Sequence, residues 1–491
     1  MRISGFLVLA VLLLSGTSLF LSADEPSEAF AVPPAMDKNG KVVSQHDIMM
    51  GNTHLAYTAI AGYLTLWKDP DASPRVASGK IFYVAYIRKG TDPATRPVAF
   101  CFNGGPGCAS AWLNLGLGPR RVDLPDDGRD VAPPYRLIDN SETWLDQTDL
   151  VFVDPIPTGY SRPAAGNGAA GFEGYQNDLG AMAEFIHSYV SDNGRWLSPK
   201  ILVGESYGTI RVAGLAAMLP AKTQIAVNGI VLMSQALNLA SDYGDSMRLP
   251  SYAATAWYHG KIGARYRSLT LDQVCADAEA FVRDKYAPAL FQGDALPKEK
   301  GRQIADELSE FTGIDTNEFL QTSLELLPDY ERKVLHSETH SVGRYDSRRI
   351  QMASFFSPLA NAPANALGAA FDAYVSVELG FHVEAPYHLT ASVDWGDSMD
   401  SGPDYRNNFS ILQTDMDRNP NLKILITGGR YDLATPYYAA KFGVDHLHLD
   451  PSVRSNVEID LYPSGHMPYI DKPSRLLLKT DFDRWMDGLK T

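Results

Sequence analysis

The chain has 491 residues, of which 45% are hydrophobic, and a formal net charge of −15 at pH 7. An acidic chain of this kind is poorly suited to binding nucleic acid or anionic membranes. Its three cysteines are too few for a disulfide scaffold, so a large apolar core must supply the stability. The length allows one large domain with an insertion, or two domains.

The amino terminus has the pattern of a targeting segment. Arg2 precedes an apolar run over residues 6–14, and small residues close the segment at Ser22 and Ala23. We therefore expect residues 1–23 to be a signal peptide and the mature protein to be exported, either periplasmic or secreted. The alternative is an uncleaved anchor, but the apolar run is short for a membrane span. No other stretch reaches that length, so no stable membrane span is expected.

The next 220 or so residues alternate between two patterns. Residues 24–60 are polar and mixed, and we interpret them as a leader before the core. Strands are expected at 79–87, 98–102, 149–154, 201–203 and 225–233. Helices are expected at 172–190 and 209–219. Strands that alternate with helices predict an α/β fold whose mostly parallel sheet is covered by helices on both faces.

The pattern becomes helical after about residue 245. Residues 270–283 and 297–312 read as amphipathic helices, and Thr270 with Gln273 fits a capping box. The strand pattern returns at 422–427 and 457–462, and a last helix is expected at 475–489. These patterns predict an α/β core from residues 24–245 and 396–491, interrupted by a mainly helical lid insertion at 246–395.

The most informative motif is residues 204–208, Gly-Glu-Ser-Tyr-Gly, between an expected strand and an expected helix. This arrangement is typical of a nucleophile elbow. Gly204 and Gly208 allow the sharp turn that exposes the Ser206 hydroxyl. Because a serine hydroxyl is a weak nucleophile without a base, the motif predicts an acid and a histidine further along the chain.

An aspartate and a histidine follow the last two expected strands. Asp432 comes after the strand at 422–427, and His466 comes after the strand at 457–462. The order Ser, Asp, His is that of the α/β-hydrolases, whose sites lie at the carboxyl ends of their strands. We expect Ser206, Asp432 and His466 to form a catalytic triad. His466 would be the base and acid, and Asp432 would orient it.

A glycine-rich turn supplies a candidate oxyanion hole. Residues 103–107 (NGGPG) follow the strand at 98–102. A hydrolase of this type needs one N–H donor directly after the nucleophile and one from such a turn. The amide of Tyr207 and an amide of this turn meet that need.

Four separated motifs occur in an order that resembles the serine carboxypeptidase family. They are 102–108 (FNGGPGC), 153–161 (VDPIPTGYS), 204–208 (GESYG), and 465–467 (GHM) with Asp471. The resemblance runs from about residue 50 to the end of the chain. It implies an α/β-hydrolase fold and hydrolysis of carboxyl-terminal peptide bonds through an acyl-enzyme, with peptide or protein carboxyl termini as partners and no cofactor or metal.

The resemblance also implies roles for individual residues. Gly105 and Tyr207 match the family's oxyanion donors. The implied substrate-binding residues are Asn103, Gly104, Glu205 and Met467. Asn103 and Glu205 match the residues that bind the substrate's terminal carboxylate. Two carboxylates repel unless they share a proton, so this role implies a preference for acidic pH.

The chain departs from the family at several points. Many relatives carry a glutamate where this chain has Gly116, and the many disulfides of eukaryotic members are missing. The missing disulfides suggest a bacterial-type member. Relatives tie the loop at Cys108 to the insertion, which suggests a Cys108–Cys275 bridge. A buried thiol at Cys275 is an equal alternative.

Two other functions use the same features. An esterase or acyltransferase could use the same triad, because this fold hosts several acyl-transfer chemistries. A catalytically silent binding protein is the third hypothesis, and an intact triad argues against it. His336 and His340 lie four apart but lack the H-E-x-x-H order, so we interpret them as a solvated helical face.

Overall fold

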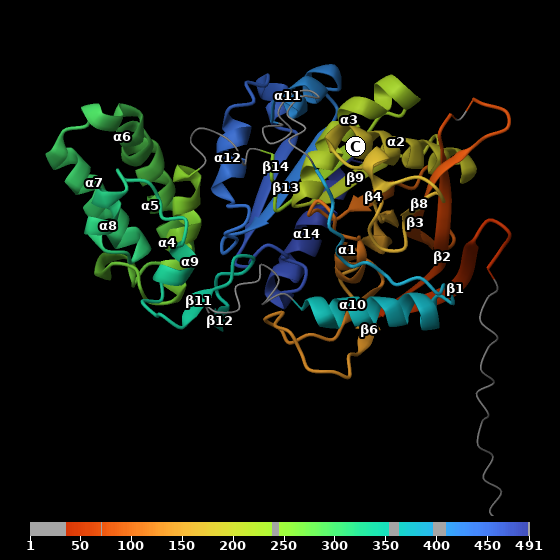
Figure 1. Ribbon diagram of the computed structural model, residues 1–491, viewed down its shortest axis with the longest axis horizontal. Coiled ribbons are helices and arrows are strands. Elements are labelled where there is room, and N and C mark those ends of the chain that lie inside the picture. Colours follow the sequence, from red (N-terminus) through yellow and green to blue (C-terminus); the bar gives the residue numbers. More distant parts are fainter. Residues whose placement is uncertain (1–35, 70, 238–244, 353–362, 396–408, 490–491) are drawn as a thin grey trace, which may run out of the picture. The chain divides into compact units, whose positions relative to one another are not determined.

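One large sheet organises the part of the chain that the computed structural model describes, residues 36–489 except 70, 238–244, 353–362 and 396–408. Its strand order is β1-β2-β3-β7-β4-β9-β10-β13-β14, with β8 beside β3 (Figure 1). The bounds are β1 Lys41–Met50, β2 Thr53–Trp67, β3 Ala77–Arg88, β4 Val98–Phe102, β7 Asp149–Val153, β8 Arg162–Pro163, β9 Lys200–Glu205, β10 Gly229–Met233, β13 Lys423–Gly429 and β14 Val457–Tyr462. The strands from β7 to β14 pair in parallel, which confirms the mostly parallel sheet.

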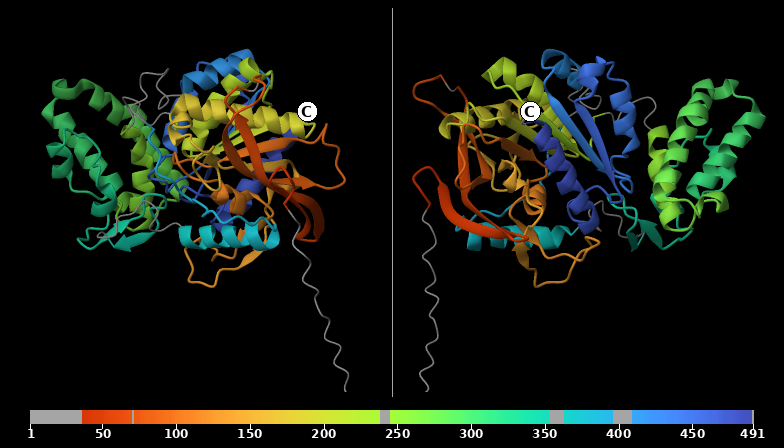
Figure 2. Two further views of the ribbon diagram at one scale, coloured as in Figure 1. Left: turned by 45° about the vertical axis from the view of Figure 1, so that its right-hand side comes forward. Right: turned by 180° about the vertical axis from the view of Figure 1, so that it is seen from behind.

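Helices cover both faces of this sheet, as predicted (Figure 2). In β4, Val98, Phe100 and Phe102 contribute to one buried cluster, whereas Ala99 and Cys101 contribute to the other. This alternation follows from the two-residue period of a strand. The first face is covered by α2 Tyr175–Asp192, α3 Tyr207–Thr223 and α11 Phe409–Arg418. The second is covered by α1 Ala111–Leu117, α10 Ala364–Ala373 and α14 Lys472–Leu489.

The interpretation of residues 24–60 as a leader was wrong for the part that is described. Two antiparallel strands, β1 and β2, pair over ten residue positions there. Along β2, buried side chains such as Leu55, Tyr57 and Ala59 alternate with more exposed ones. An antiparallel strand with one solvated face reads as polar and mixed in sequence, which explains the error. The expected signal peptide at 1–23 lies outside the described residues.

The segment between β10 and β13 is mainly helical, and we call residues 246–395 the insertion. Its first helices are α4 Leu249–Tyr258, α5 Leu271–Phe281, α6 Ala287–Gln292, α7 Lys298–Thr312, α8 Thr316–Gln321 and α9 Tyr330–Lys333. They share a hydrophobic core of their own. The capping box of α5 is confirmed, because the side chains of Thr270 and Gln273 each accept the other's backbone N–H. The exact limits of the insertion stay a prediction.

The later part of the insertion returns to the sheet. A small separate hairpin, β11 His340–Val342 and β12 Ile350–Met352, follows α9. Residues of α10 such as Leu367 and Phe371 then pack into the cluster on the second face of the sheet. The insertion therefore contacts the core through more than its two ends.

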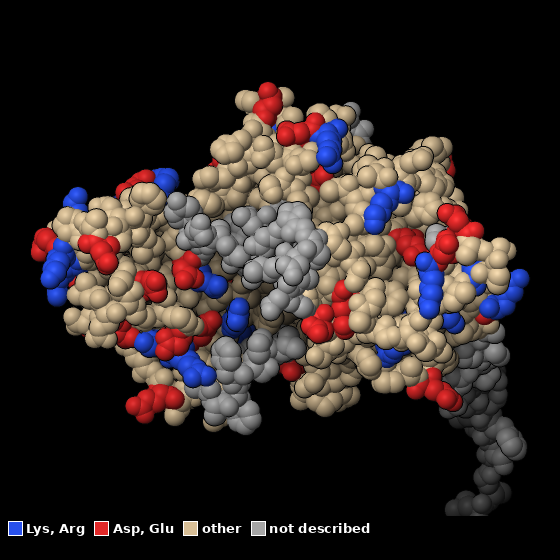
Figure 3. All heavy atoms as spheres, turned by 45° about the horizontal axis from the view of Figure 1, so that its top comes forward, with Lys and Arg blue, Asp and Glu red and all other residues tan. Residues whose placement is uncertain are grey.

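Within the described residues, no helix is both long and apolar enough to cross a membrane. On the face shown in Figure 3, acidic and basic side chains are interspersed over the surface. The negative net charge is therefore not gathered into one acidic patch on that face.

Candidate active site

The nucleophile candidate stands on a strained turn. Ser206 links β9 to α3 with φ 57° and ψ −126°, a conformation that few non-glycine residues adopt. Its N–H donates to the carbonyl of Met233 at 3.0 Å. A Cβ on Gly204 would lie 2.2 Å from the Gly208 oxygen, and a Cβ on Gly208 would lie 2.4 Å from the Phe102 oxygen. The two glycines of the motif are thus required by close backbone contacts.

The expected acid and base are in contact. His466 Nδ1 lies 2.6 Å from Asp432 Oδ2, and both side chains are buried. Asp432 also accepts the hydroxyl of Thr435 at 2.6 Å and the backbone N–H groups of Ala434 and Thr435. With Nδ1 held by Asp432, Nε2 is left to serve Ser206, which lines the same pocket as His466.

The electrostatics of this pair favour a protonated histidine. Burial lowers the pKa of His466, but the Asp432 carboxylate raises it by charge and by hydrogen bonding, and the net direction is upward. Glu205 raises the pKa of His466 further. An imidazolium formed when Ser206 attacks would therefore be stabilised by Asp432.

The glycine-rich turn lies directly against the nucleophile. A Cβ on Gly104 would lie 2.6 Å from the Tyr207 nitrogen and 2.8 Å from the Ser206 Cβ. Gly105 has φ +105°, which disfavours any other residue there. Tyr207 is the first residue of α3, so its N–H has no acceptor within the helix. This geometry suits an oxyanion hole formed by Gly105 and Tyr207.

A buried ion pair, Arg211 with Asp178, contacts the glycine-rich turn at residues 103–107. Arg211 Nε donates to Asp178 Oδ2 at 2.8 Å, and Arg211 Nη1 donates to the Asn103 carbonyl at 2.7 Å. The Arg211 guanidinium also lies over the rings of Tyr207 and Phe102. Both charged side chains are almost fully buried. The ion pair thus holds the backbone at the start of the turn.

Asn103 and Glu205 meet in the pocket beside Ser206. The Asn103 side-chain oxygen accepts the Leu113 N–H at 3.0 Å, which leaves the amide NH₂ to face the carboxylate. Burial raises the pKa of Glu205 to about 7, although His466, Tyr469 and Asn103 each lower it. Met467 and Gly104 line the same pocket. The structure therefore brings together all the expected site residues other than Cys275.

A model of the serine carboxypeptidase family matches residues 51–456. The chain belongs to the serine carboxypeptidase family. Serine carboxypeptidase-like 45 of Arabidopsis thaliana is 24% identical over 229 residues, which cover 45% of this chain and 44% of that protein. Carboxypeptidase Y homolog A of Talaromyces stipitatus is 33% identical over 84 residues, or 17% of this chain and 14% of that protein. These matches span less than half the length of the relatives.

A solved structure extends the likeness to most of the chain. KEX1(DELTA)P, a prohormone-processing carboxypeptidase from Saccharomyces cerevisiae, is similar with a TM-score of 0.54. The likeness covers 88% of this chain and 92% of that one, at 16% identity. It confirms the α/β-hydrolase fold.

The bridge that the family suggested between Cys108 and Cys275 is absent. All three cysteines are free thiols. Cys275 is buried in the core of the insertion, which raises the pKa of its thiol. Cys108 instead lines the pocket with Ser206, and burial raises its thiol pKa to about 11. The alternative of a buried thiol at Cys275 is the one observed.

The stretch that carries His336 and His340 is not the helical face expected. His340 begins β11, and His336 is an exposed residue with φ 53° whose ring lies 2.8 Å from the Gly313 carbonyl. No cluster of metal-ligating side chains occurs among the residues described.

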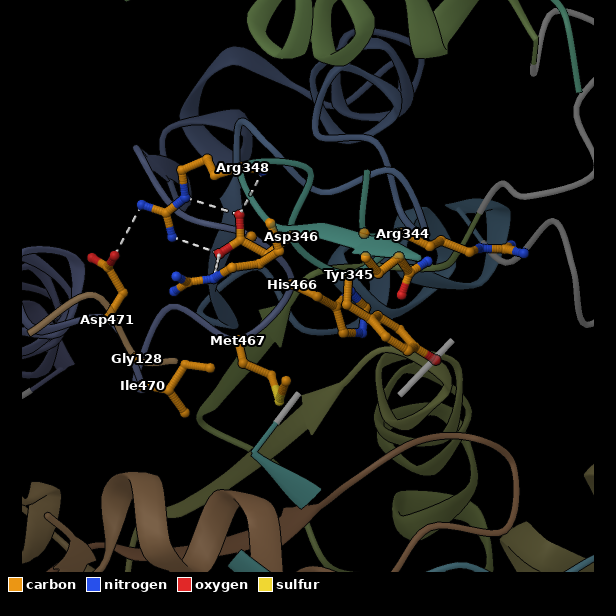
Figure 4. Close-up of a pocket in the computed structure, with 13 residues that line it drawn as sticks. Gly128, Arg344, Tyr345, Asp346, Arg348, His466, Met467, Ile470 and Asp471 are labelled. Carbon is orange, nitrogen blue, oxygen red and sulfur yellow. Dashed lines mark hydrogen bonds and ion pairs between the residues drawn. The ribbon is translucent and has the colours of Figure 1, made fainter. Parts of the chain in front are cut away.

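The insertion holds the loop that carries the histidine (Figure 4). The His466 N–H donates to the Tyr345 carbonyl at 2.6 Å, and the two rings lie 4.9 Å apart. Arg348 bridges Asp346 and Asp471, with its Nη1 donating to Asp471 Oδ2 at 2.9 Å. Asp471, known from sequence only as a motif residue, is therefore a docking point for the insertion.

Sequence reasoning missed four side chains of this site. Thr435 donates a hydrogen bond to Asp432, the Tyr345 ring packs at a tilt against His466, Trp112 lines the pocket, and Tyr469 lies beside Glu205. The surroundings of Asp432 had a usable local signal, because an aspartate side chain commonly accepts the backbone N–H groups of the residues just after it, here Ala434 and Thr435. The other three are placed by tertiary packing and carry no local signal.

Proposed function

We propose that this chain is a serine-type carboxypeptidase that hydrolyses the last peptide bond of a peptide or protein through an acyl-enzyme. The observation that carries the proposal is the buried carboxyl of Glu205 beside Asn103, in the same pocket as Ser206. A site that binds a terminal carboxylate next to the nucleophile selects the last peptide bond. The activities named for the relatives agree with this proposal.

The proposed chemistry follows from the triad. The Ser206 hydroxyl attacks the carbonyl carbon while His466 takes its proton, and Gly105 and Tyr207 N–H groups bind the oxyanion. The tetrahedral intermediate expels the amine of the last residue, which takes the proton from His466. A water molecule then attacks the acyl-enzyme by the same proton path, releasing the shortened peptide and restoring Ser206.

The carboxylate site makes this activity depend on pH. Below about pH 7, Glu205 keeps a proton and can donate a hydrogen bond to the substrate carboxylate. Above that value Glu205 is ionised, the two carboxylates repel, and binding weakens. Glu205 also raises the pKa of His466, so protonation of Glu205 lowers that pKa and helps keep the base neutral in mild acid. Both effects favour acidic pH.

The test is kcat/KM for matched peptides with a free carboxyl terminus or a terminal amide, measured from about pH 4 to about pH 9. We expect wild type to prefer the free acid, and the preference to fall about tenfold per pH unit above about pH 7. Glu205→Gln should lose this basic limb, because an amide donates at any pH. Its acid limb should shift to lower pH, because the charge that raises the His466 pKa is gone.

Glu184→Gln is the matched control. Glu184 is a half-buried glutamate that accepts the Trp67 N–H at 2.7 Å, and it is outside the pocket of Ser206. It should leave the profile unchanged. Equal cleavage of acid and amide by wild type at every pH would overturn the carboxypeptidase proposal and favour an esterase or a broader hydrolase.

We also propose that the protein is exported. The pattern of residues 1–23 supports this, and one relative, a carboxypeptidase of Saccharomyces cerevisiae, is named as vacuolar. Sequencing the amino terminus of the protein recovered from culture medium or periplasm tests the proposal, with Asp24 expected as the first residue. A chain that keeps Met1 and stays with the cells would contradict it.

A further inference from the structure

Tyr469 fills the space beside Gly116. A Cβ on Gly116 would lie 2.4 Å from Cδ2 and 2.7 Å from Cγ of the Tyr469 ring. Tyr469 is only 2% exposed and follows His466 by three residues in the same loop. A larger side chain at position 116 and this ring therefore exclude each other. Many relatives carry a glutamate at that position, so the ring stands where their acid side chain would begin.

The phenol of Tyr469 faces the carboxylate site. Its hydroxyl lies near Glu205 and Asn103, and this proximity lowers the pKa of Glu205, while burial and the Glu205 charge raise the pKa of the phenol itself. Glu205 Oε2 and the Tyr469 hydroxyl are both sealed from solvent, and neither completes a hydrogen bond of normal geometry within the described part of the chain. Both atoms thus keep capacity for a partner at this site.

We propose that Tyr469 is a positioning residue that donates a hydrogen bond to Glu205 and fixes which oxygen of Glu205 presents a proton to the substrate. The inference rests on the proposed carboxypeptidase function. A buried phenol stays protonated and so donates. One Glu205 oxygen accepts from Tyr469, and the other oxygen carries the acidic proton toward the terminal carboxylate. Tyr469 is outside the set of residues that line the pocket, so it acts through Glu205.

A tyrosine beside Glu205 differs from a second acid beside Glu205 in the number of protons that the site loses near neutral pH. Two neighbouring carboxyl groups share protons and titrate as a coupled pair. A phenol and one carboxyl group leave a single proton to be lost near neutral pH. The binding of free-acid substrates should therefore decline above about pH 7 with the slope of one ionisation.

The test is the pH profile of Tyr469→Phe on the same free-acid and amide peptides. The ring is kept, so the packing against Gly116 is kept. Loss of the hydrogen bond should raise KM for free-acid peptides about three- to tenfold, with kcat and amide cleavage little changed. Because the phenol lowers the pKa of Glu205, its loss should move the basic limb upward by about half a pH unit or more.

Tyr462→Phe is the matched control. This buried tyrosine ends β14 in the strand before the same loop and donates to Asp481 at 3.1 Å, away from Glu205. It should leave the basic limb in place. A Tyr469→Phe profile that matches wild type overturns the inference and leaves the proposed function standing. Absence of any free-acid preference in wild type overturns both.

A second pair of variants tests the exchange between positions 116 and 469. Tyr469→Ala should lose most of the preference for free acids over amides. Gly116→Glu combined with Tyr469→Ala should regain it, because the alanine vacates the space that the ring occupied. A double variant no better than Tyr469→Ala would contradict the exchange.

Discussion

Replacing Arg211 by methionine is expected to destabilise the protein by about 3–5 kcal/mol. Arg211 is paired with Asp178, and the two side chains are 1% and 3% exposed. Methionine keeps the apolar stem but leaves the Asp178 carboxylate buried without its partner. It also removes the donor to the Asn103 carbonyl.

The corresponding change in melting temperature can be worked from chain length. At about 2.1 cal/mol/K per residue, unfolding 491 residues has an entropy near 1 kcal/mol/K. A loss of about 3–5 kcal/mol then lowers the melting temperature by about 3–5 °C. Because Asn103 begins the oxyanion turn, kcat/KM should fall as well, by about tenfold or more.

The loss should depend on pH and should be reversible by a second mutation. Burial raises the pKa of Asp178 despite Arg211, and removing Arg211 raises it further. An acid whose folded pKa exceeds its unfolded value of 3.8 destabilises the fold above that value, so the loss should shrink as pH falls toward 4. Arg211→Met with Asp178→Leu removes the buried charge and should recover most of the stability but not the activity.

Thermal unfolding followed by circular dichroism, at about pH 4.5 and about pH 7.5, measures these effects. Arg283→Met is the control, because its pair with Asp284 is exposed and should leave the melting temperature unchanged. A single variant that melts like wild type at both pH values would refute the reasoning, as would a double variant less stable than the single one.

Three further predictions concern the triad and the turn. Ser206→Ala or His466→Ala should lower kcat by about 10⁴–10⁶ with an unchanged melting temperature, and a serine variant within tenfold of wild type would exclude this nucleophile. Asp432→Asn should lose less than the serine variant, because Asp432 orients and stabilises His466 without bonding to substrate; an unchanged rate would point to another carboxylate. Gly104→Ala should lower kcat about 10²-fold or more, because the added methyl group would push the turn away from the Tyr207 N–H. The measurement is kcat, corrected for the fraction of active enzyme by active-site titration. Full activity would place the oxyanion hole elsewhere.

The fold and the placement of the three triad candidates in one site could be predicted because their signals are local. The motif at 204–208 needs particular glycines for a tight turn, and the acid and the histidine each follow a buried strand of a parallel sheet. The first two strands, β1 and β2, were missed because their half-solvated faces dilute the apolar pattern.

Parts of the site could not be predicted because they depend on distant contacts. Gly116 and Tyr469 are separated by more than three hundred residues, and no local sequence pattern near either one indicates that they are in contact. Whether Cys108 and Cys275 could pair also depended on tertiary placement, and the structure puts the two thiols in different places.

The contact between the insertion and the histidine loop limits how this scaffold can be rebuilt. A Cβ on Gly465 would lie 2.2 Å from the Tyr345 oxygen, the same atom that accepts the His466 N–H. A chimera that exchanged the helical segment for that of another hydrolase would remove this carbonyl and the Arg348 bridge together. Under the proposed function, specificity and catalysis would therefore not be separable by exchanging the whole insertion. A working graft has to retain residues 343–349 and replace only the helices that precede them.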